Sequence, residues 1–405
     1  MSVVSDVSIL ICLLLIITTA AMAGSARDTA DIMPPAAFAQ ATGHPLQAEM
    51  DAFVSRQASS ASFEGSGLRN SDYLRLIQKQ VKAFRPCQDS TGAIIDPVQK
   101  IEWQYSTPCY ALSVALLAST GYDRDPELLA SGIKAMSCSV DEMHEYRCAH
   151  NHGEFFIQPV MLALDLYAKI VPTERWKQKL RTLDPYKLYP DNLRRKKVCY
   201  NHNVVALAGE YLLIKDGLDG DQAFFDEHMA HQRVYISRRG MYKDQDPNNP
   251  IVYDEFTRQF IDSILVEGYS GPDRDFYCDG MWRGAWTSLF MQSPFGECPA
   301  GGRSAQHIWN ESASAVTYEI YAAQYARKGR MAEAGAFKRA AHLSLRCIER
   351  WYRPDGSGYV VKNRFPIEAR YGYESYSAQS QYNLLACWLM AVAHLYADDA
   401  IAERP

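Results

Sequence analysis

The sequence contains no CxxC pair and no closely spaced framework of cysteines. Its ten cysteines are spread along 405 residues, so neither a zinc ribbon nor a small disulfide-stapled fold is expected. Cys12 lies in an N-terminal apolar stretch, and the remaining nine cysteines are an odd number, which cannot all pair with one another. Cys138 and Cys148 flank a loop and could pair in an exported protein, whereas Cys109 and Cys387 lie in apolar helical patterns typical of small core residues.

An excess of basic residues is also absent. The 42 Lys and Arg are outnumbered by 47 Asp and Glu, for a formal net charge of -5. This balance argues against a nucleic-acid partner, because phosphates require a basic surface. The one basic run, "LRRKK" at 193–197, is expected in a solvated turn, with phosphate binding as the alternative. The 25 tyrosines and seven tryptophans suit a carbohydrate partner or a large core.

Only one long apolar run is present, and it lies at the N-terminus. Residues 9–17 are apolar, and Ala21-Met22-Ala23 forms a small-residue cleavage site, so we predict a signal peptide over residues 1–23. The protein is then secreted or periplasmic, or cytoplasmic if Met22 or Met33 is the true start. The run is too short to predict a membrane span, and the sequence has no second candidate. No integral membrane domain is therefore expected after signal removal.

Strand-like alternation is nearly absent, and helical periodicity dominates. Residues 24–70, rich in Ala, Ser, Gln and Gly, are predicted to be a linker or loosely attached segment. One short hairpin element is expected at 356–363. Within 71–397 we predict helices near 72–85, 107–119, 126–137, 155–168, 173–183, 202–214, 221–236, 253–265, 281–291, 308–327, 331–351 and 377–395.

Consecutive pairs among these helices predict an all-α fold, an (α/α)6 toroid of about six helical hairpins. A plain α-solenoid is the competing architecture, but no repeat of fixed length occurs. In a toroid, loops at one end converge on a pocket, so motifs that are distant in sequence meet there. Polar clusters do precede the apolar helices, namely "HNHGE" at 150–154, "CYNHN" at 199–203, "EGYSGPDRDFYCDG" at 267–280, "GGRSAQHIWNE" at 301–311 and "YGYESYSAQSQYN" at 371–383.

The cluster at 301–311 carries an unusual stripe of polar residues. Counted from Arg303, the positions of His307, Asn310 and Glu311 are i+4, i+7 and i+8, which share one face of a helix. An arginine fork binds a carboxylate through two hydrogen bonds. We therefore expect Arg303 to clamp an acidic sugar, His307 and Asn310 to contact it, and Glu311 to orient it or act as an acid. A structural ion pair is the alternative role for Arg303.

Each polar cluster also has a purely structural interpretation. Residues 151–154 match a capping box, and Asn201 with its neighbours can cap the following helix. The aspartates of 273–279 could bind calcium, but they lack EF-hand spacing. No HExxH motif occurs, so we predict no metal and no cofactor, although a metal site could be assembled across loops from His150, His152, His202 or His307.

Two reactions use such polar groups. Hydrolysis of a glycosidic bond requires two carboxylates, one as acid and the other as base or nucleophile. β-Elimination next to a uronate requires a group that neutralises the substrate carboxylate, and a Tyr or His that handles the C5 proton. The residue types in the five clusters allow either reaction.

The motifs "NHGEFF", "NHNVVALAGEYLL", "GGRSAQHIWNE" and "YESYSAQSQYNLL" resemble those of (α/α)6-toroid enzymes acting on uronic-acid glycans. The sequence is most similar to glucuronidase-like hydrolases such as glycoside hydrolase family 154 and to a related family of uncharacterised toroid domains. Heparinase II/III-type lyases are a more distant likeness. The resemblance covers roughly residues 70–397.

The resemblance implies roles for particular residues. In the lyase pattern, Asn201 and His202 match the neutralising and proton-handling residues, and Tyr269 or Tyr277 the base. In the hydrolase pattern, an acidic pair comes from Glu154, Asp279, Glu311 and Glu374, and further substrate contacts are expected from His152, Tyr376 and Gln379.

Heparinase-type lyases also carry a β-sandwich after the toroid, which this sequence does not show before Pro405. We therefore predict a glycoside hydrolase acting on uronate-containing glycans. Polysaccharide lyase activity is the first alternative, and a glycan-binding toroid without catalysis is the second.

Overall fold

The computed structural model describes residues 29–36, 43–59, 63–194, 201–245 and 251–405. The predicted signal peptide lies outside these ranges. None of the helices within them is both long and apolar enough to cross a membrane.

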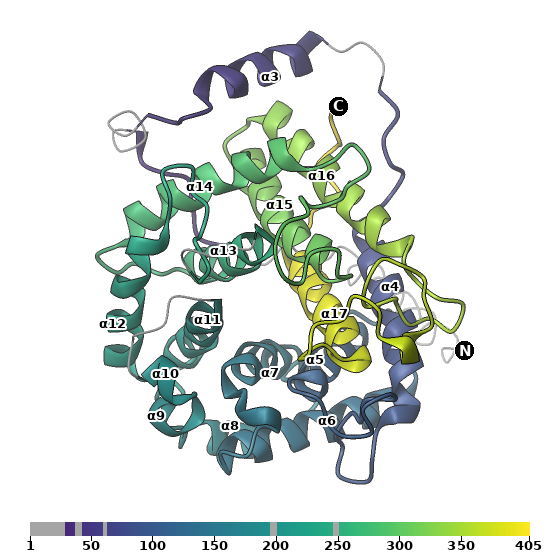
Figure 1. Ribbon diagram of the computed structural model, residues 1–405. Helices are drawn as coiled ribbons and strands as arrows, with labels where there is room; N and C mark the ends of the chain where they lie inside the picture. Colours follow the sequence, from purple (N-terminus) through teal and green to yellow (C-terminus); the bar gives the residue numbers. More distant parts are fainter. Residues whose placement is uncertain (1–28, 37–42, 60–62, 195–200, 246–250) are drawn as a thin grey trace, which may run out of the picture.

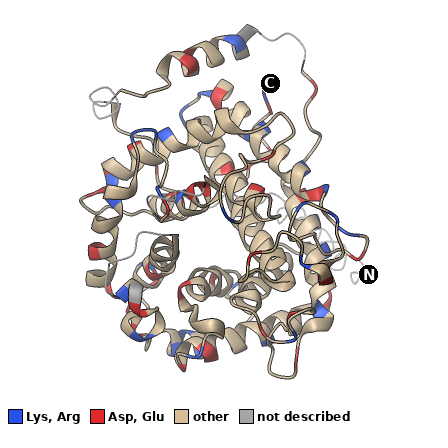
Figure 2. Ribbon diagram, viewed as in Figure 1, with Lys and Arg blue, Asp and Glu red and all other residues tan. Residues whose placement is uncertain are grey.

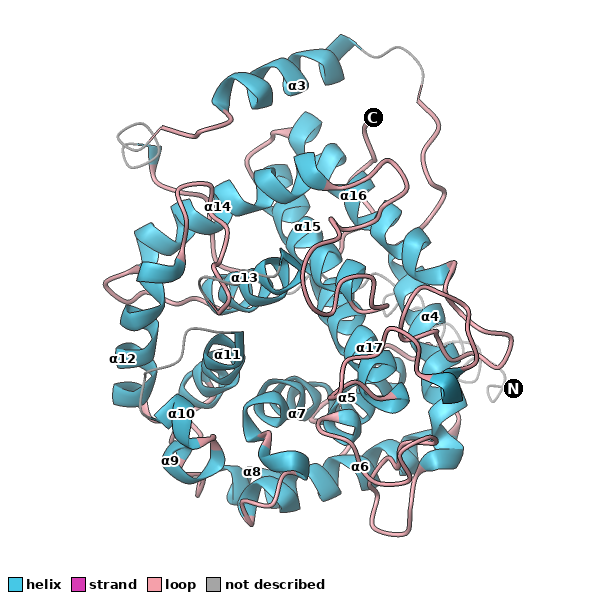
Figure 3. Cartoon of the chain, viewed as in Figure 1, coloured by secondary structure: helices cyan, strands magenta, loops and turns pink. Residues whose placement is uncertain are grey.

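Helices make up almost all of the regular structure (Figures 1 and 3). Their bounds are α3 Gln47–Ser59, α4 Asn70–Phe84, α5 Ser106–Ser119, α6 Pro126–His144, α7 Gly153–Tyr167, α8 Glu174–Leu180, α9 Pro185–Leu188, α10 Asp191–Arg194, α11 Asn201–Lys215, α12 Gln222–Gln232, α13 Ile251–Val266, α14 Arg274–Met291, α15 Asn310–Arg327, α16 Met331–Glu349 and α17 Gln379–Tyr396. Each of the twelve predicted helical segments overlaps one of these helices, so the all-α prediction is confirmed.

Six helices form a closed inner ring. Helices α5, α7, α11, α13, α15 and α17 each contact the next, and α17 returns to contact α5. The helices α4, α6, α12, α14 and α16 pack outside them, as Figure 1 shows. The predicted (α/α)6 toroid is therefore confirmed.

Sequence composition explains which helices are inner. Nearly every residue of α7, α15 and α17 is buried, as expected for helices that are apolar or small on all sides. The outer helix α4 buries one face only, whereas the outer helix α16 is buried along most of its length. Lys and Arg accordingly lie mostly on the outer helices and on loops (Figure 2).

Two smaller predictions have mixed outcomes. In the described residues, the expected hairpin at 356–363 is reduced to isolated bridges, Tyr352 with Gly358 and His307 with Val361. The predicted linker 24–70 contains helix α3, whose Phe53 packs edge-on against Trp286 of α14. Whether this segment is loosely attached stays a prediction.

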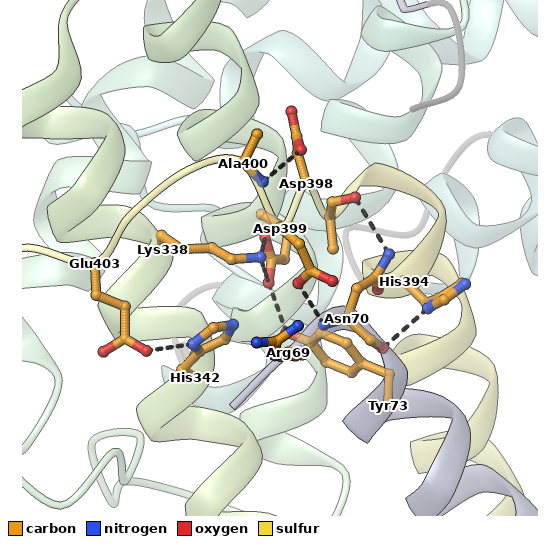
Figure 4. Close-up of polar contacts among 12 residues, drawn as sticks. Arg69, Asn70, Tyr73, Lys338, His342, His394, Asp398, Asp399, Ala400 and Glu403 are labelled. Atoms are coloured by element: carbon orange, nitrogen blue, oxygen red, sulfur yellow. Dashed lines mark hydrogen bonds and ion pairs between the residues drawn. The ribbon is translucent and has the colours of Figure 1, made fainter. Parts of the chain in front are cut away.

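Polar contacts, two of them buried, join the first helix of the toroid to its C-terminal part (Figure 4). Lys338 of α16 donates to Glu319 of α15 at 2.9 Å, and both side chains are inaccessible to solvent. The hydroxyl of Tyr73, from the first toroid helix α4, donates to the same carboxylate at 3.0 Å. The C-terminal segment of the chain also contacts α4, because the backbone N–H of Asn70 donates to Asp399 at 2.7 Å. Together these contacts attach α4 to α15 and α16.

We predict that Lys338→Ala destabilises the protein by about 3–5 kcal/mol, because it leaves the Glu319 carboxylate buried without its cation. Chemical denaturation measures this change. The matched control is Lys82→Ala, which removes a half-exposed lysine from its ion pair with Asp123 and should cost less than about 1 kcal/mol. Equal losses in the two variants would contradict a structural role for the buried pair.

Candidate active site

A cavity of about 360 Å³ lies at one end of the inner ring. All six inner helices contribute to its lining through their first turns or N-caps: Tyr105 before α5, His152 before α7, Asn201 and His202 of α11, Tyr253 of α13, Trp309 before α15, and Gln381 and Tyr382 of α17. Loop residues, among them Arg303 and Tyr376, complete it. The N-terminus of a helix carries unpaired N–H groups and a partial positive charge. Six such ends around one cavity favour an anionic ligand.

Two histidines at the cavity wall share one carboxylate. His152 Nδ1 and His202 Nδ1 each lie 2.8 Å from Glu154 Oε1. Glu154 is fully buried behind them, whereas the two imidazoles are partly exposed and line the cavity. The structure therefore brings together three predicted site residues that are separated by up to 50 positions in the sequence.

Electrostatics keep Glu154 ionised. Burial alone would raise its pKa, but the hydrogen bonds from His152 and His202 lower the pKa to about 2. Burial lowers the pKa of His202, Glu154 opposes this shift, and the positive charge of Arg303 adds to it. The buried Glu154 carboxylate thus accepts a hydrogen bond from each imidazole on the side that faces away from the cavity.

Arg303 forms a second polar group on the cavity wall. Its guanidinium lies 4.1 Å from the centre of the Tyr253 ring, in cation–π geometry. One terminal nitrogen contacts Asp244 at 3.2 Å, and the other donates to the Tyr376 hydroxyl at 3.2 Å. These partners hold the planar group at the wall, as the predicted clamp requires.

Asp244 is a residue that the sequence analysis missed. It is fully buried and accepts the backbone N–H of Asn201 at 2.6 Å and its side-chain amide at 3.2 Å, besides the contact with Arg303. Burial raises its pKa to about 6, against these hydrogen bonds and the arginine. It lies in "YKDQDP", a segment with no periodicity, so only the tertiary contacts reveal that Asp244 supports both Asn201 and Arg303.

A network of hydroxyl groups continues along the wall from Arg303. The hydroxyls of Tyr253 and Tyr376 each lie 2.9 Å from Ser304 Oγ. The predicted acid Glu374 accepts the Ser304 backbone N–H at 2.9 Å. Glu374 therefore orients the loop that carries Arg303, and it does not line the cavity.

The predicted polar stripe on a single helix is wrong. Helix α15 begins at Asn310, and Arg303 lies in the turn before it, where Ser304 and Gln306 have positive φ angles of 58° and 64°. These left-handed residues reverse the chain, so Arg303 reaches the cavity while Glu311 enters the core.

Three members of the stripe accordingly have structural contacts. Glu311 is fully buried, forms an ion pair with Lys362 and accepts the Cys298 N–H at 3.1 Å. Asn310 accepts the backbone N–H of His307 at 2.9 Å. The His307 ring packs on Tyr382 at 5.1 Å between ring centres, and burial lowers its pKa to about 4.

The remaining predicted site residues also lie away from the cavity. Asp279 is paired with Arg283 at 2.8 Å within α14 of the outer layer. Tyr277 donates to the Met229 carbonyl, and Tyr269 packs edge-on against Phe225. Gln379 donates to the Gly358 carbonyl at 2.9 Å. The cluster at 267–280 therefore belongs to outer-layer packing, because the α13–α14 connection does not end at the cavity.

No family model matches the sequence, and no curated protein matches it. Solved structures do share the fold. A glycosyl hydrolase of family 88 from Bacteroides vulgatus aligns over 81% of this chain and 99% of its own, with a TM-score of 0.55 and 11% identity. A possible family 105 member from Salmonella enterica aligns over 82% and 96%, with a TM-score of 0.52 and 13% identity.

Two further structures have the same architecture. An unsaturated glucuronyl hydrolase variant from Streptococcus agalactiae covers 81% of this chain and 91% of its own, with a TM-score of 0.53 and 11% identity. A polysaccharide lyase covers 80% and 97%, with a TM-score of 0.52 and 12% identity. This chain thus shares the α/α toroid fold with these hydrolases and with the polysaccharide lyase.

Asp244 should make stability depend on pH. Its pKa rises from 3.8 to about 6 on folding, so the folded state binds its proton more tightly than the unfolded state does. Its contribution to stability is therefore present at low pH and is lost as the pH rises from about 4 to about 6. We predict that Asp244→Asn removes most of this loss, which is on the order of 3 kcal/mol. Denaturation at several pH values measures the difference from wild type.

The control for this experiment is Asp275→Asn, which changes an exposed aspartate on α14 and should leave the pH profile unaltered. If Asp244→Asn and wild type show the same pH dependence, the buried carboxyl does not titrate as proposed.

Proposed function

We propose that this protein is an enzyme that hydrolyses glycans or oligosaccharides containing a uronic acid. The observation that carries the proposal is the placement of Arg303 at a cavity surrounded by six helix N-termini. Both features favour a negatively charged ligand. The shared fold with glycosyl hydrolases and a polysaccharide lyase supports a carbohydrate substrate.

Arg303 has the geometry of a carboxylate clamp. Its two terminal nitrogens are steadied by Asp244 and Tyr376, and its face rests on Tyr253. A guanidinium carries five N–H donors, so donors remain for a substrate carboxylate. Asn201, which also lines the cavity, supplies an amide beside it.

The other walls suit a sugar ring. Phe155, Tyr253, Phe256, Trp309 and Tyr382 supply aromatic faces or edges around the cavity. Such surfaces pack against the C–H faces of sugars, while tyrosine hydroxyls bind their hydroxyl groups. A uronate has an anionic carboxylate and apolar ring faces. Arg303 can bind the carboxylate, and the aromatic walls can pack against the ring faces.

Hydrolysis also requires groups that bind and activate a water molecule. His152 and His202, backed by the Glu154 carboxylate, place two imidazoles on the cavity wall. Histidine is the side chain best suited to proton handling near neutral pH. The shared fold with an unsaturated glucuronyl hydrolase supports a reaction at a glucuronic acid derivative.

Two finer proposals rest on the sequence. The motifs around Asn201 and Arg303 support a likeness to glycoside hydrolase family 154. The apolar run and cleavage site before Gly24 support export, which would place the enzyme where extracellular glycans are found.

β-Elimination is the second candidate, and one observation favours it. Among the described residues that line the cavity there is no Asp or Glu, whereas Arg303 and Asn201 could neutralise a uronate and His202 or Tyr253 could accept its C5 proton. In hydrolysis, the carboxylates Glu154 and Asp244 would therefore act through the imidazoles and the arginine that lie between them and the cavity.

A panel of saturated and unsaturated uronate oligosaccharides, followed by ultraviolet absorbance and by reducing-end release, distinguishes these reactions. Hydrolysis of a saturated substrate releases reducing ends without any absorbance change. Hydrolysis of an unsaturated substrate lowers the absorbance as the double bond is lost. A rise in absorbance would identify elimination, and binding without any product would contradict both enzymatic proposals.

We predict that Arg303→Lys raises KM for an acidic substrate by at least about tenfold while changing KM for a neutral analogue little, because lysine cannot form the two-pronged contact. Steady-state kinetics on the matched pair of substrates measures the effect. The control is Arg233→Lys, which alters an arginine that is paired with Asp273 away from the cavity. Equal effects of Arg303→Lys on the two substrates would contradict the clamp.

A further inference from the structure

We propose that His152, Glu154 and His202 bind one divalent metal ion of the zinc type at the wall of the cavity. The role we give this ion in substrate binding rests on the proposed function, whereas ion binding itself does not. No metal is expected from the sequence because no compact motif is present, but the toroid brings together the three residues from the N-terminal ends of α7 and α11.

The three side chains meet the geometric requirement of a metal site. Their ligand atoms all lie within 4.8 Å of one another, and each imidazole nitrogen is 2.8 Å from Glu154 Oε1. Zinc binds nitrogen and oxygen at about 2.0–2.2 Å. Ligand atoms at such distances from a tetrahedral ion lie about 3.3–3.6 Å from one another, so each imidazole would move away from Glu154 by about half an ångström to admit the ion.

The donor set also has suitable chemistry. Two imidazoles and one carboxylate are the protein ligands of many hydrolytic zinc sites, in which the fourth position stays open to water or substrate. Both imidazoles point at the same carboxylate oxygen, while Glu154 Oε2 is buried with no hydrogen-bond partner among the described residues. One carboxylate oxygen can accept both hydrogen bonds, and the same convergence of two nitrogens and one oxygen is the arrangement that a bound ion requires.

The backbone holds this arrangement firmly. Gly153, between two of the ligands, packs so closely that a Cβ atom there would lie 2.4 Å from the Leu188 carbonyl oxygen. The Phe155 ring packs edge-on against the imidazoles of His152 and His202, at 5.8 and 4.9 Å between ring centres. These contacts restrict the ring orientations, as the ligands of a metal site require.

The position of the ion gives it a role in recognition. Both histidines line the same cavity as Arg303, so an open coordination position would face the substrate. A uronate carboxylate could then bind Arg303 on one side and the metal ion on the other. Binding of acidic sugars should accordingly be weaker in metal-free protein.

The test is calorimetric titration of the chelator-treated full-length protein with zinc chloride, with cobalt(II) absorption as a second readout. We expect one ion per chain, and a cobalt spectrum of tetrahedral coordination without the ultraviolet band of a cobalt–thiolate bond. His152→Ala and Glu154→Gln should each weaken zinc binding by at least about tenfold.

The matched control is His150→Ala, in the same loop. His150 Nδ1 accepts the backbone N–H of Gln104 at 3.2 Å, and the His150 side chain is outside the cluster. This variant should bind zinc as wild type does, and thermal melting establishes that each variant is folded. If a ligand variant does not fold, the cobalt spectrum of wild type still decides the ligand type.

The results separate this proposal from the proposed function. Absence of zinc binding by wild type, a thiolate band, or equal losses in His150→Ala and His152→Ala would overturn the metal site. Cleavage of uronate substrates by protein that binds no zinc would overturn it as well and leave the enzymatic function standing, with the imidazoles as proton acceptors. Zinc binding at these residues without cleavage of any uronate would support the metal site and reject the function.

Discussion

The common direction of the inner helices is the constraint on which the site depends. Because six helices run the same way around the ring, their N-termini and positive dipole ends meet at one end of the toroid. The core of this ring is almost entirely helix–helix packing. The cavity follows from this geometry, because the ring is wide enough to leave its mouth open.

Buried carboxylates then determine how cationic and polar side chains are oriented at the cavity wall. Asp244 lies behind Asn201 and Arg303, and Glu154 lies behind His152 and His202. Each anion is withdrawn from solvent and hydrogen-bonded to groups that line the cavity. The wall that a ligand meets therefore carries amide, imidazole and guanidinium groups, and its negative charge is one layer deeper. This layering explains how a chain of net charge -5 places an arginine and two imidazoles at the cavity wall.

Similar solved structures share the toroid at only 11–13% identity. Such similarity concerns packing of helices, and function has to be argued from the side chains at the mouth. Here those side chains are an arginine stacked on Tyr253, two histidines on one carboxylate, and a set of aromatic walls. The same groups could serve hydrolysis or elimination, since both reactions need carboxylate recognition and proton handling.

The amino-acid sequence by itself determined the helices, their pairing into a toroid and the convergence of distant polar loops. Local periodicity and capping carry this information, because burial of an apolar face repeats every three to four residues. It also singled out His152, Glu154, Asn201, His202 and Arg303. Only the tertiary structure decided that Glu311 is a core ion-pair partner and that Asp244 supports the site. Those assignments depend on left-handed residues at 304 and 306 and on contacts between residues tens of positions apart. Neither feature repeats at a regular interval in the sequence, so periodicity could not predict them.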